Sequence, residues 1–186
     1  ELVVIVDGSK DTTAKILVTY GDEIQVIAQE NTGKPIALNR AMLDAKGDLI
    51  WIVDDDDIVA PDARERLVNA LIETPEAGFS YGRHDRFFDD EETGERHHID
   101  TGYWFDCDPE EFLCATLEDF FAHQCGMMVR KSVYDEVGPF EDVFSEDYEM
   151  LIRLALATKP VAIPGIIFSQ RQHSGVRGTA ISPVKI

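Results

Sequence analysis

Four consecutive aspartates at positions 54–57 directly follow the apolar stretch at 49–53. Two like charges ~6 Å apart, in a medium with an effective dielectric constant of about 20, repel each other by about 3 kcal/mol. Charge runs are usually solvated loops, but this one lies between a buried-type strand and a helix that Pro61 opens. Because ligands of open α/β sheets bind at the carboxyl ends of strands, we favour a divalent-metal site. Ligands that are all oxygen indicate Mg²⁺ or Mn²⁺.

The chain has 186 residues, of which 44% are hydrophobic and 28% are charged. This length and composition are typical of one globular domain. A net charge of −19 argues against a nucleic-acid partner, because phosphate binding needs basic patches. No apolar stretch reaches the length of a membrane span. The three cysteines have no zinc-binding spacing, which favours reduced thiols. We therefore expect a cytoplasmic protein, acting in solution or at the inner membrane surface, and make no prediction of its oligomeric state.

Short apolar stretches alternate with amphipathic ones through the first half of the chain. The predicted strands are 2–6, 24–28 and 48–53. The predicted helices are 14–18, 33–45 and a stretch opened by Pro61. Strands that alternate with helices indicate a parallel sheet.

The pattern changes after Gly78. The turn residues at 89–94 separate two stretches, 79–88 and 96–101, that are expected to form a hairpin. Beyond them we expect helices at 109–121, 132–138 and 145–158, strands at 124–129 and 161–168, and a polar, irregular tail at 170–186. The chain is thus predicted to be one α/β domain, with a nucleotide-binding half at about 1–77 and an acceptor-side half at about 78–186.

Five groups of residues that suit a common chemistry follow one another along the chain. They are 4–11 (VIVDGSKD), 31–39 (NTGKPIALN), 53–57 (VDDDD) with Pro61 and Asp62, 137–140 (VGPF) with 146–150 (EDYEM), and 171–173 (RQH). In this order and spacing the series resembles the family 2 glycosyltransferases, inverting enzymes of the GT-A fold that use nucleotide-sugar donors. The resemblance covers nearly the whole chain. It implies a parallel or mixed sheet flanked by helices, a nucleotide-sugar donor, an acceptor with a free hydroxyl such as a saccharide, and Mn²⁺ or Mg²⁺.

The chain departs from the family pattern in two ways. Val6 stands where the family usually has an acidic residue, and the strand and helix that usually precede this part of the fold are absent before Leu2. That strand commonly carries part of the nucleobase pocket. Because an uncovered apolar strand is prone to aggregation, we expect an upstream segment or a partner chain to cover residues 2–6.

The resemblance assigns nucleotide contacts to six residues near strand ends and a helix start. They are Asp7, Gly8, Ser9, Lys34, Asp54 and Asp55. For Asp7, a role in forming the turn before Gly8 is an equal alternative to contact with a uracil or ribose edge. Lys34 is expected at a helix start, where the helix dipole disfavours a positive charge. A phosphate bound to Lys34 would explain a lysine at this position. The alternative is a solvated surface lysine, which is the more common case.

In the aspartate run, residues two apart point the same way if strand geometry persists. Asp54 and Asp56 then form the Asp-x-Asp pair of the family. The resemblance gives Asp56 the metal, Asp54 the ribose or the metal, and His173 a place in the metal shell or beside the diphosphate. Asp57 is expected to be a structural cap, and Arg171 and Arg177 to pair with phosphate.

Asp147 is the expected general base, which takes the proton of the acceptor hydroxyl. The alternative is that Glu146 and Asp147 only stabilise the start of their helix, where acidic residues favour the dipole. Tyr103, Trp104 and Phe105 are candidates for stacking on an acceptor sugar, with core packing as the more common use of such rings.

Three other functions compete with glycosyl transfer. A haloacid-dehalogenase-like phosphatase also places an Asp-x-Asp after a strand, but the residues around Ile58 fit it poorly. A nucleotidyltransferase would need a glycine-rich loop followed by an arginine. The third alternative is an inactive domain that binds a metal, a nucleotide or a sugar without catalysis.

Overall fold

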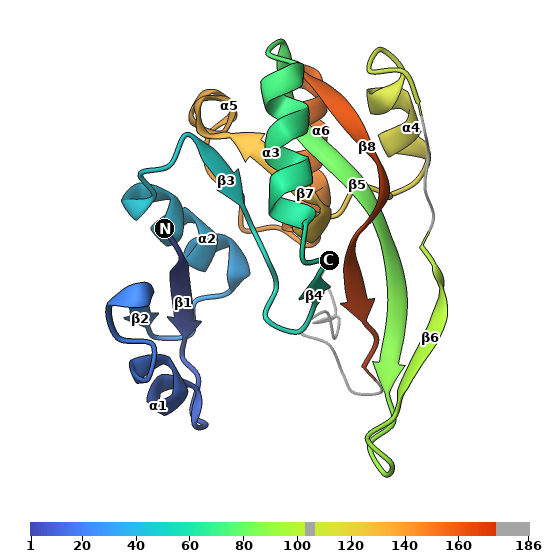
Figure 1. Ribbon diagram of the computed structural model, residues 1–186. Helices are drawn as coiled ribbons and strands as arrows, with labels where there is room; N and C mark the ends of the chain where they lie inside the picture. The colour runs from blue at the N-terminus through green and yellow to red at the C-terminus, as the bar shows by residue number, and fades with distance from the viewer. Residues whose placement is uncertain (103–106, 174–186) are drawn as a thin grey trace, which may run out of the picture.

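The computed structural model describes residues 1–102 and 107–173 (Figure 1). The strands are β1 (Val3–Asp7), β2 (Gln25–Gln29), β3 (Leu49–Trp51), β4 (Ile58–Val59), β5 (Ala77–Asp89), β6 (Arg96–Thr101), β7 (Met127–Arg130) and β8 (Lys159–Arg171). The α-helices are α1 (Thr13–Val18), α2 (Lys34–Asp44), α3 (Ala63–Glu73), α4 (Phe112–Glu118), α5 (Lys131–Val137) and α6 (Glu146–Ala157). Two short 3₁₀ helices, η1 (Gly21–Glu23) and η2 (Gln124–Gly126), complete the described elements.

The strands form two sheets. β1 and β2 pair in parallel, from Val3 opposite Gln25 to Asp7 opposite Gln29. The larger sheet has the order β3-β7-β5-β8-β4, and β6 pairs with the far end of β5. Only β5 and β8 are parallel in this sheet, whereas β3–β7, β5–β7, β4–β8 and β5–β6 are antiparallel. The predicted α/β fold with a mixed sheet flanked by helices is confirmed, as is the β5–β6 hairpin. The parallel sheet predicted for the first three strands is confirmed for β1 and β2 only, because β3 belongs to the larger sheet and is antiparallel to β7.

Helices cover both faces of the larger sheet (Figure 1). On one face α3 buries Leu67 and Leu71 against residues of β7 and β8. On the other face α4, α5 and α6 pack on β5 and β7, with the rings of Phe79 and Tyr81 at the centre. Side chains alternate along β5, so Ser80 points to the α3 side and donates a hydrogen bond to the Leu67 carbonyl oxygen, 2.9 Å away.

Several boundaries differ from the sequence-based predictions. The strand expected at 48–53 ends at Trp51, because the aspartate run turns back on itself and leads into β4, which the sequence did not reveal. The strand expected at 124–129 begins only at Met127, since Gln124–Gly126 forms a 3₁₀ turn closed by a hydrogen bond from Gly126 to His123. The last strand continues to Arg171, into the stretch expected to be irregular.

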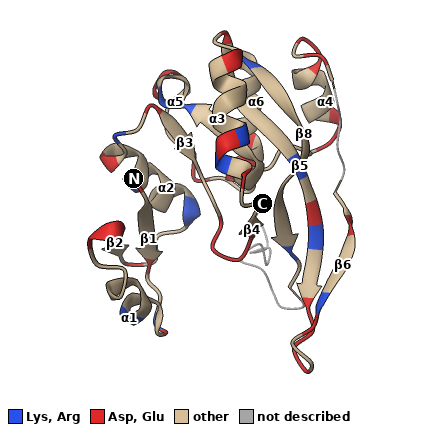
Figure 2. Ribbon diagram, viewed as in Figure 1, with Lys and Arg blue, Asp and Glu red and all other residues tan. Residues whose placement is uncertain are grey.

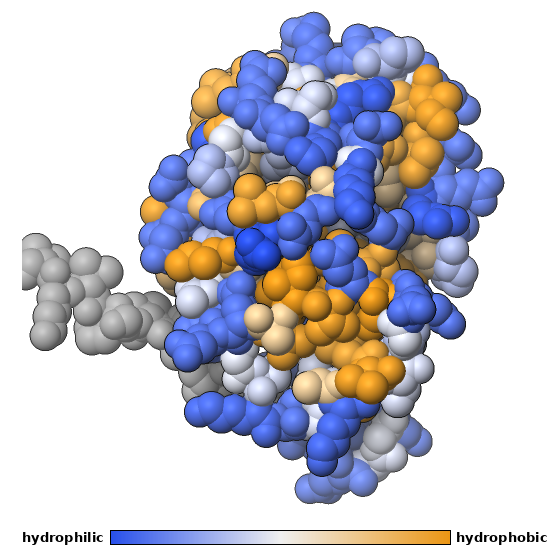
Figure 3. Space-filling view, turned by 90° about the vertical axis from the view of Figure 1, so that its left-hand side faces the viewer, coloured by the Kyte–Doolittle hydropathy of each residue, from blue (hydrophilic) through white to orange (hydrophobic). Residues whose placement is uncertain are grey.

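The side of the molecule that carries β1 and β2 exposes apolar side chains (Figure 3). Large hydrophobic residues that are exposed in this part of the chain include Leu2, Ile16, Val18 and Val26. Within the described residues, β1 has β2 as its only strand partner. That an upstream segment or a partner chain covers the other edge of β1 stays a prediction, as does the single-domain organisation. None of the described helices has the length and hydropathy needed to cross a bilayer.

Candidate functional site

The aspartate run forms a tight turn between β3 and β4, and it is the acidic loop below β3 in Figure 2. The backbone N–H of Asp57 donates to the Asp54 carbonyl oxygen at 3.3 Å. Strand geometry therefore ends before the run. The prediction that Asp54 and Asp56 point the same way required an extended strand, and this condition is not met. Asp55 is exposed and makes no hydrogen bond or ion pair with another described residue.

Lys34 forms an ion pair with Asp54, with 2.6 Å between Nζ and Oδ1. The lysine opens α2, and Gly33 before it has a φ of 91°, a conformation that favours glycine. Partial burial alone would lower the pKa of Lys34, but the negative charges of Asp54, Glu146 and Asp147 raise it above its ordinary value. The start of α2 and the acidic turn are therefore in contact through Lys34, and the charges at the start of α6 act on the same lysine.

Asp56 contacts the end of the chain's last described strand. Its Oδ2 lies 3.0 Å from Nε2 of His173. The neighbouring Arg171 donates from Nε to the Asp56 carbonyl oxygen at 3.0 Å, and from its backbone N–H to Oδ1 of Asp57 at 3.0 Å. The structure thus brings together Asp56 and His173, which are 117 positions apart and are two of the three residues that the sequence analysis assigned to the metal.

Arg171 has a different set of contacts from the one expected. Its guanidinium forms an ion pair with Asp89 and lies 4.9 Å from the centre of the Phe87 ring. In this structure it holds the acidic turn against the end of β8, and its pairing with a phosphate stays a prediction. Arg177, the second arginine of that prediction, lies outside the described residues, as do Tyr103, Trp104 and Phe105.

Cys125 is a part of the site that the sequence analysis missed. Its buried Sγ accepts a hydrogen bond from the Asp54 backbone N–H at 3.1 Å, and its carbonyl oxygen accepts one from the Trp51 ring nitrogen at 2.9 Å. Asp54, Asp57 and Cys125 offer ligand atoms that all lie within 4.8 Å of one another. Burial raises the pKa of the Cys125 thiol, and it also raises that of the Asp57 carboxyl. A lone cysteine 68 positions after Asp57 carries no sequence signal for this contact, because only the fold joins them.

Asp7, at the end of β1, organises the segment that leads into α2. Its Oδ1 accepts hydrogen bonds from Nε2 of Gln29 at 2.8 Å and from the backbone and hydroxyl of Thr32 at 2.9 and 3.3 Å. Its Oδ2 accepts the Gly33 N–H at 2.9 Å. Burial alone would raise the pKa of Asp7, but these hydrogen bonds outweigh it and lower the pKa. The carboxylate is thus charged and held in place, with one acceptor position of Oδ2 left over.

Gly8 and Ser9 form the turn after Asp7. Gly8 has a φ of 78°, and a Cβ atom there would lie 2.7 Å from the Asn31 backbone nitrogen. Glycine is therefore required both by the backbone conformation and by the close approach of the next loop. Ser9 is exposed and makes no hydrogen bond to another residue that the structure describes.

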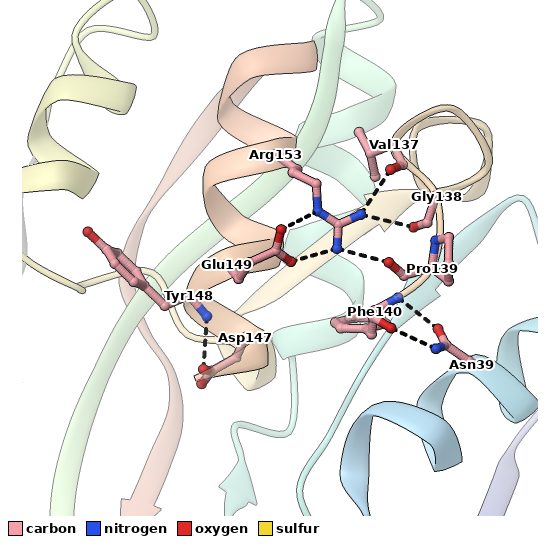
Figure 4. A network of polar contacts seen from close by, with 9 residues as sticks. All are labelled: Asn39, Val137, Gly138, Pro139, Phe140, Asp147, Tyr148, Glu149 and Arg153. Carbon is pink, nitrogen blue, oxygen red and sulfur yellow. Dashed lines mark hydrogen bonds and ion pairs between the residues drawn. The ribbon is translucent and has the colours of Figure 1, made fainter. Parts of the chain in front are cut away.

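Asp147 lies in the first turn of α6, and its charge is one of those that raise the pKa of Lys34. It is half-buried, and its Oδ1 accepts the N–H of Tyr148 at 2.8 Å (Figure 4). Burial, together with the charge of Asp147, raises the pKa of the neighbouring Glu146. The arrangement offers a carboxylate at a helix start close to the Lys34–Asp54 pair.

Comparison with known families explains this arrangement. Residues 1–138 match the family model described as "Glycosyl transferase family 2". The chain belongs to this glycosyltransferase family. The matched part includes Asp7, Lys34 and the aspartate run, whereas Asp147 and His173 lie beyond it. The recognised resemblance to family 2 glycosyltransferases is confirmed at this level.

Curated relatives and solved structures agree with this membership. An uncharacterized glycosyltransferase of Rickettsia felis is 27% identical over 94% of this chain, which spans 29% of that protein. The poly-beta-1,6-N-acetyl-D-glucosamine synthase of Staphylococcus aureus is 36% identical over 42% of this chain and 20% of its own length. The chain thus spans about a third or less of the curated relatives it matches.

Two solved glycosyltransferases share the fold of this family 2 member. Staphylococcus aureus TarS, in complex with UDP-GlcNAc, has a TM-score of 0.76 at 17% identity over 97% of this chain and 52% of its own. The mannosyltransferase PcManGT of Pyrobaculum calidifontis, in complex with GDP-Man and Mn²⁺, has a TM-score of 0.64 at 19% identity over 91% of this chain and 47% of its own. At these identities the likeness shows the fold, which is that of GT-A glycosyltransferases.

Proposed function

We propose that this chain carries the donor site and the catalytic base of an inverting, metal-assisted glycosyltransferase. It would move a sugar from a nucleotide-sugar donor, with UDP as the expected nucleotide, to a hydroxyl of a saccharide or another acceptor. The single observation that carries the proposal is the 2.6 Å ion pair between Lys34 and Asp54, beside the charges of Glu146 and Asp147. This arrangement links the three motifs of the proposal: Lys34 for donor binding, Asp54 for metal binding and Asp147 for proton transfer.

In this proposal the donor lies across the ends of β1 and β3. Asp7 has an acceptor position left for the uracil or ribose, and Gly8 and Ser9 line the same turn. Asp54 and Asp55 face the nucleotide from the acidic turn. Lys34 neutralises a phosphate, because a lysine at a helix start is otherwise opposed by the helix dipole. The UDP-GlcNAc held by TarS, which shares the fold, supports a UDP-linked sugar as the first donor to test.

The residues of the acidic turn fit a divalent cation. Asp56 and His173 already contact each other at 3.0 Å, and the carboxylate oxygen is a ligand type that suits Mn²⁺. Asp56 and His173 would hold the metal, with Asp54 as a further ligand once Lys34 turns to the phosphate. A bound divalent cation stabilises the charge of the leaving nucleoside diphosphate. The Mn²⁺ bound by PcManGT, of the same fold, supports this assignment.

Asp147 is proposed to act as the general base. Its carboxylate takes the proton of the acceptor hydroxyl while that oxygen attacks the anomeric carbon of the donor sugar. The bond from this carbon to the diphosphate breaks on the opposite face, so the product has the inverted anomeric configuration. The position of Asp147 near Lys34 supports this role, because base and diphosphate must flank one sugar ring.

A thermal-shift panel tests the proposal directly. The protein is melted with UDP, GDP and ADP, each with and without Mn²⁺, and UDP release from UDP-N-acetylglucosamine is then measured with N-acetylglucosamine oligomers as acceptors. At a hundred times the dissociation constant, binding adds about 2.7 kcal/mol, which raises the melting temperature of a chain of this size by about 5–10 °C. Lys34→Met should remove most of this rise, and Lys46→Met, an exposed lysine near the far end of α2, should keep it.

Three outcomes are decisive. A rise with UDP that requires Mn²⁺, followed by UDP release, supports the enzyme. The same rise without any release identifies an inactive nucleotide-binding domain. No response to any nucleoside diphosphate contradicts the proposal.

A further inference from the structure

The start of α6 is tied to α2 by a polar network that the proposed chemistry does not use (Figure 4). Asn39, in the middle of α2, donates from Nδ2 to the Phe140 carbonyl oxygen at 2.8 Å. Its Oδ1 accepts the Phe140 backbone N–H, also at 2.8 Å. Both polar atoms of the side-chain amide are thus bonded to one residue that lies 101 positions away.

The same loop is clamped from its other side by Arg153 of α6. The guanidinium donates to the carbonyl oxygens of Val137 and Pro139, each at 2.9 Å. It also forms a bidentate pair with Glu149, one turn earlier in α6, at 2.8 and 2.6 Å. The loop between α5 and α6 is therefore held between two helices by side chains that bond its backbone, and the charged bonds of Arg153 add geometric specificity.

The loop ends in an uncommon backbone conformation just before the proposed base. Ser145, directly before α6, has a φ of 59°, which is uncommon for a residue with a side chain. Such a conformation persists only where the surroundings determine it. Asp147 follows two residues later. A loop free to relax at Ser145 would move the Asp147 carboxylate relative to Lys34, which opens the helix that carries Asn39.

We propose that Asn39 is a positioning residue for glycosyl transfer, because its double hydrogen bond with Phe140 sets where Asp147 lies relative to Lys34. Asn39 does not touch the donor or the acceptor in this proposal. It acts through the loop and α6. The inference rests on the proposed function, since a positioning role has meaning only if Asp147 serves as the base.

This role predicts a separation between donor binding and turnover. Lys34 keeps its own contact with Asp54 when Asn39 is replaced, so donor affinity should persist. Turnover should fall, because a misplacement of about 1 Å between reacting groups lowers rates by about a hundredfold. A merely structural residue would instead reduce the amount of folded protein and leave the turnover of each folded molecule unchanged.

The test compares Asn39→Ala with Asn69→Ala, an exposed asparagine of α3 that makes no side-chain hydrogen bond to a described residue. Calorimetric titration with UDP and Mn²⁺ gives the dissociation constant and the fraction of molecules that bind. UDP release from UDP-N-acetylglucosamine, with N-acetylglucosamine oligomers, gives kcat per binding-competent molecule. We expect Asn39→Ala to lower kcat about tenfold to a hundredfold with a dissociation constant within about twofold of the wild type. Asn69→Ala should match the wild type in both.

A second variant covers the case in which Asn39→Ala does not fold. Asn39→Asp keeps the size and the acceptor for the Phe140 N–H but turns a carboxylate oxygen toward the Phe140 carbonyl oxygen. Protonation of that carboxylate restores a donor, so the ratio of variant to wild-type kcat should rise as the pH is lowered.

The outcomes separate this inference from the proposed function. Wild-type kcat per binding site in Asn39→Ala, or in Asn39→Asp at every pH if the alanine variant does not fold, overturns the positioning role while transfer itself stands. A loss of UDP affinity in parallel with kcat overturns it as well. A wild type that neither binds UDP nor releases it from the donor overturns the proposed function, and this inference with it.

Discussion

Nε2 of His173 lies 3.0 Å from Oδ2 of Asp56, although 117 positions separate the two residues. The contact is possible because β8 continues to Arg171, whose backbone and side chain bond the acidic turn. In the proposed function the pair would supply one metal ligand from each of two distant segments, so that the metal site would form only in the folded chain.

Replacement of His173 tests this pair. We expect His173→Gln to raise the Mn²⁺ dissociation constant, measured in the presence of UDP, by about tenfold or more, because the imidazole nitrogen is lost while the turn is kept. His98→Gln is the matched control, since His98 also lies near a carboxylate, 3.8 Å from Asp85. Asp56→Asn should weaken Mn²⁺ at least as strongly, and full Mn²⁺-dependent stabilisation of Asp56→Asn by UDP would contradict the assignment.

Asp147→Asn tests the proposed base. The amide keeps the size of the side chain and the hydrogen bond from the Tyr148 N–H, but it does not accept the proton. Loss of one positioned carboxylate should lower kcat by about 10²- to 10⁴-fold while UDP and Mn²⁺ still bind. Asp142→Asn, an exposed aspartate in the loop before α6, should keep full activity.

The stereochemistry of the product provides an independent check on Asp147. An NMR spectrum of the first product formed should show an anomeric configuration opposite to that of the donor. Retention of configuration would exclude direct displacement, even if Asp147→Asn were inactive.

Much of the fold was predictable because periodicity reports burial directly. The spacing of Leu67 and Leu71, and of Met150 and Leu154, predicted α3 and α6, and both helices bury those residues. The region around the aspartate run was predicted less well. An extended strand there would repeat like charges side by side, whereas the turn allows Asp54 to reach Lys34 and Asp56 to reach His173.

The residues that hold the site in place could not be predicted from the sequence, and the reason is physical. Cys125 contacts Asp54 through a turn that tertiary packing selects, and Asn39 contacts Phe140 across 101 positions. Neither residue belongs to a local pattern with its partner, so periodicity and spacing carry no information about the contact. The proposed chemical groups of the site came from their motifs, whereas the contacts that hold them in place were visible only in the folded structure.

The turn after β1 should be sensitive to a single methyl group. Gly8→Ala places a Cβ 2.7 Å from the Asn31 nitrogen and imposes a left-handed conformation on a residue with a side chain. Gly94→Ala is the control, because Gly94 has a φ of 72° but no atom within 4 Å of the place that the added methyl group would take. The conformational cost, about 1–2 kcal/mol, applies to both variants, and the collision adds to it only in Gly8→Ala. Urea unfolding should therefore show a larger loss for Gly8→Ala, and equal losses would mean that the Asn31 loop yields freely.

Acid should destabilise the protein through His123. Its ring lies 4.6 Å from the His84 ring and 4.5 Å from that of Phe120. Burial, with a smaller contribution from nearby positive charges, lowers the pKa of His123 to about 3, whereas a histidine in the unfolded chain has a pKa of about 6.5. The unfolded state therefore binds one more proton between these two pH values. Stability is complete above pH ~6.5 and falls by about 1.4 kcal/mol per pH unit as the pH drops toward 3.

The variant His123→Phe isolates this contribution, because phenylalanine fills a similar volume and takes up no proton. The free energy of unfolding in urea is measured at pH 7.5 and pH 5 for the wild type, for His123→Phe and for His97→Phe, which replaces an exposed histidine. Between these pH values the wild type and His97→Phe should lose about 2 kcal/mol more than His123→Phe does. The carboxylates act in all three proteins and cancel in the difference. Buried His84, whose pKa burial also lowers, contacts the His123 ring, so the difference reports His123 together with its effect on His84. An equal loss in all three proteins would show that His123 takes up its proton as readily in the folded chain as in the unfolded one.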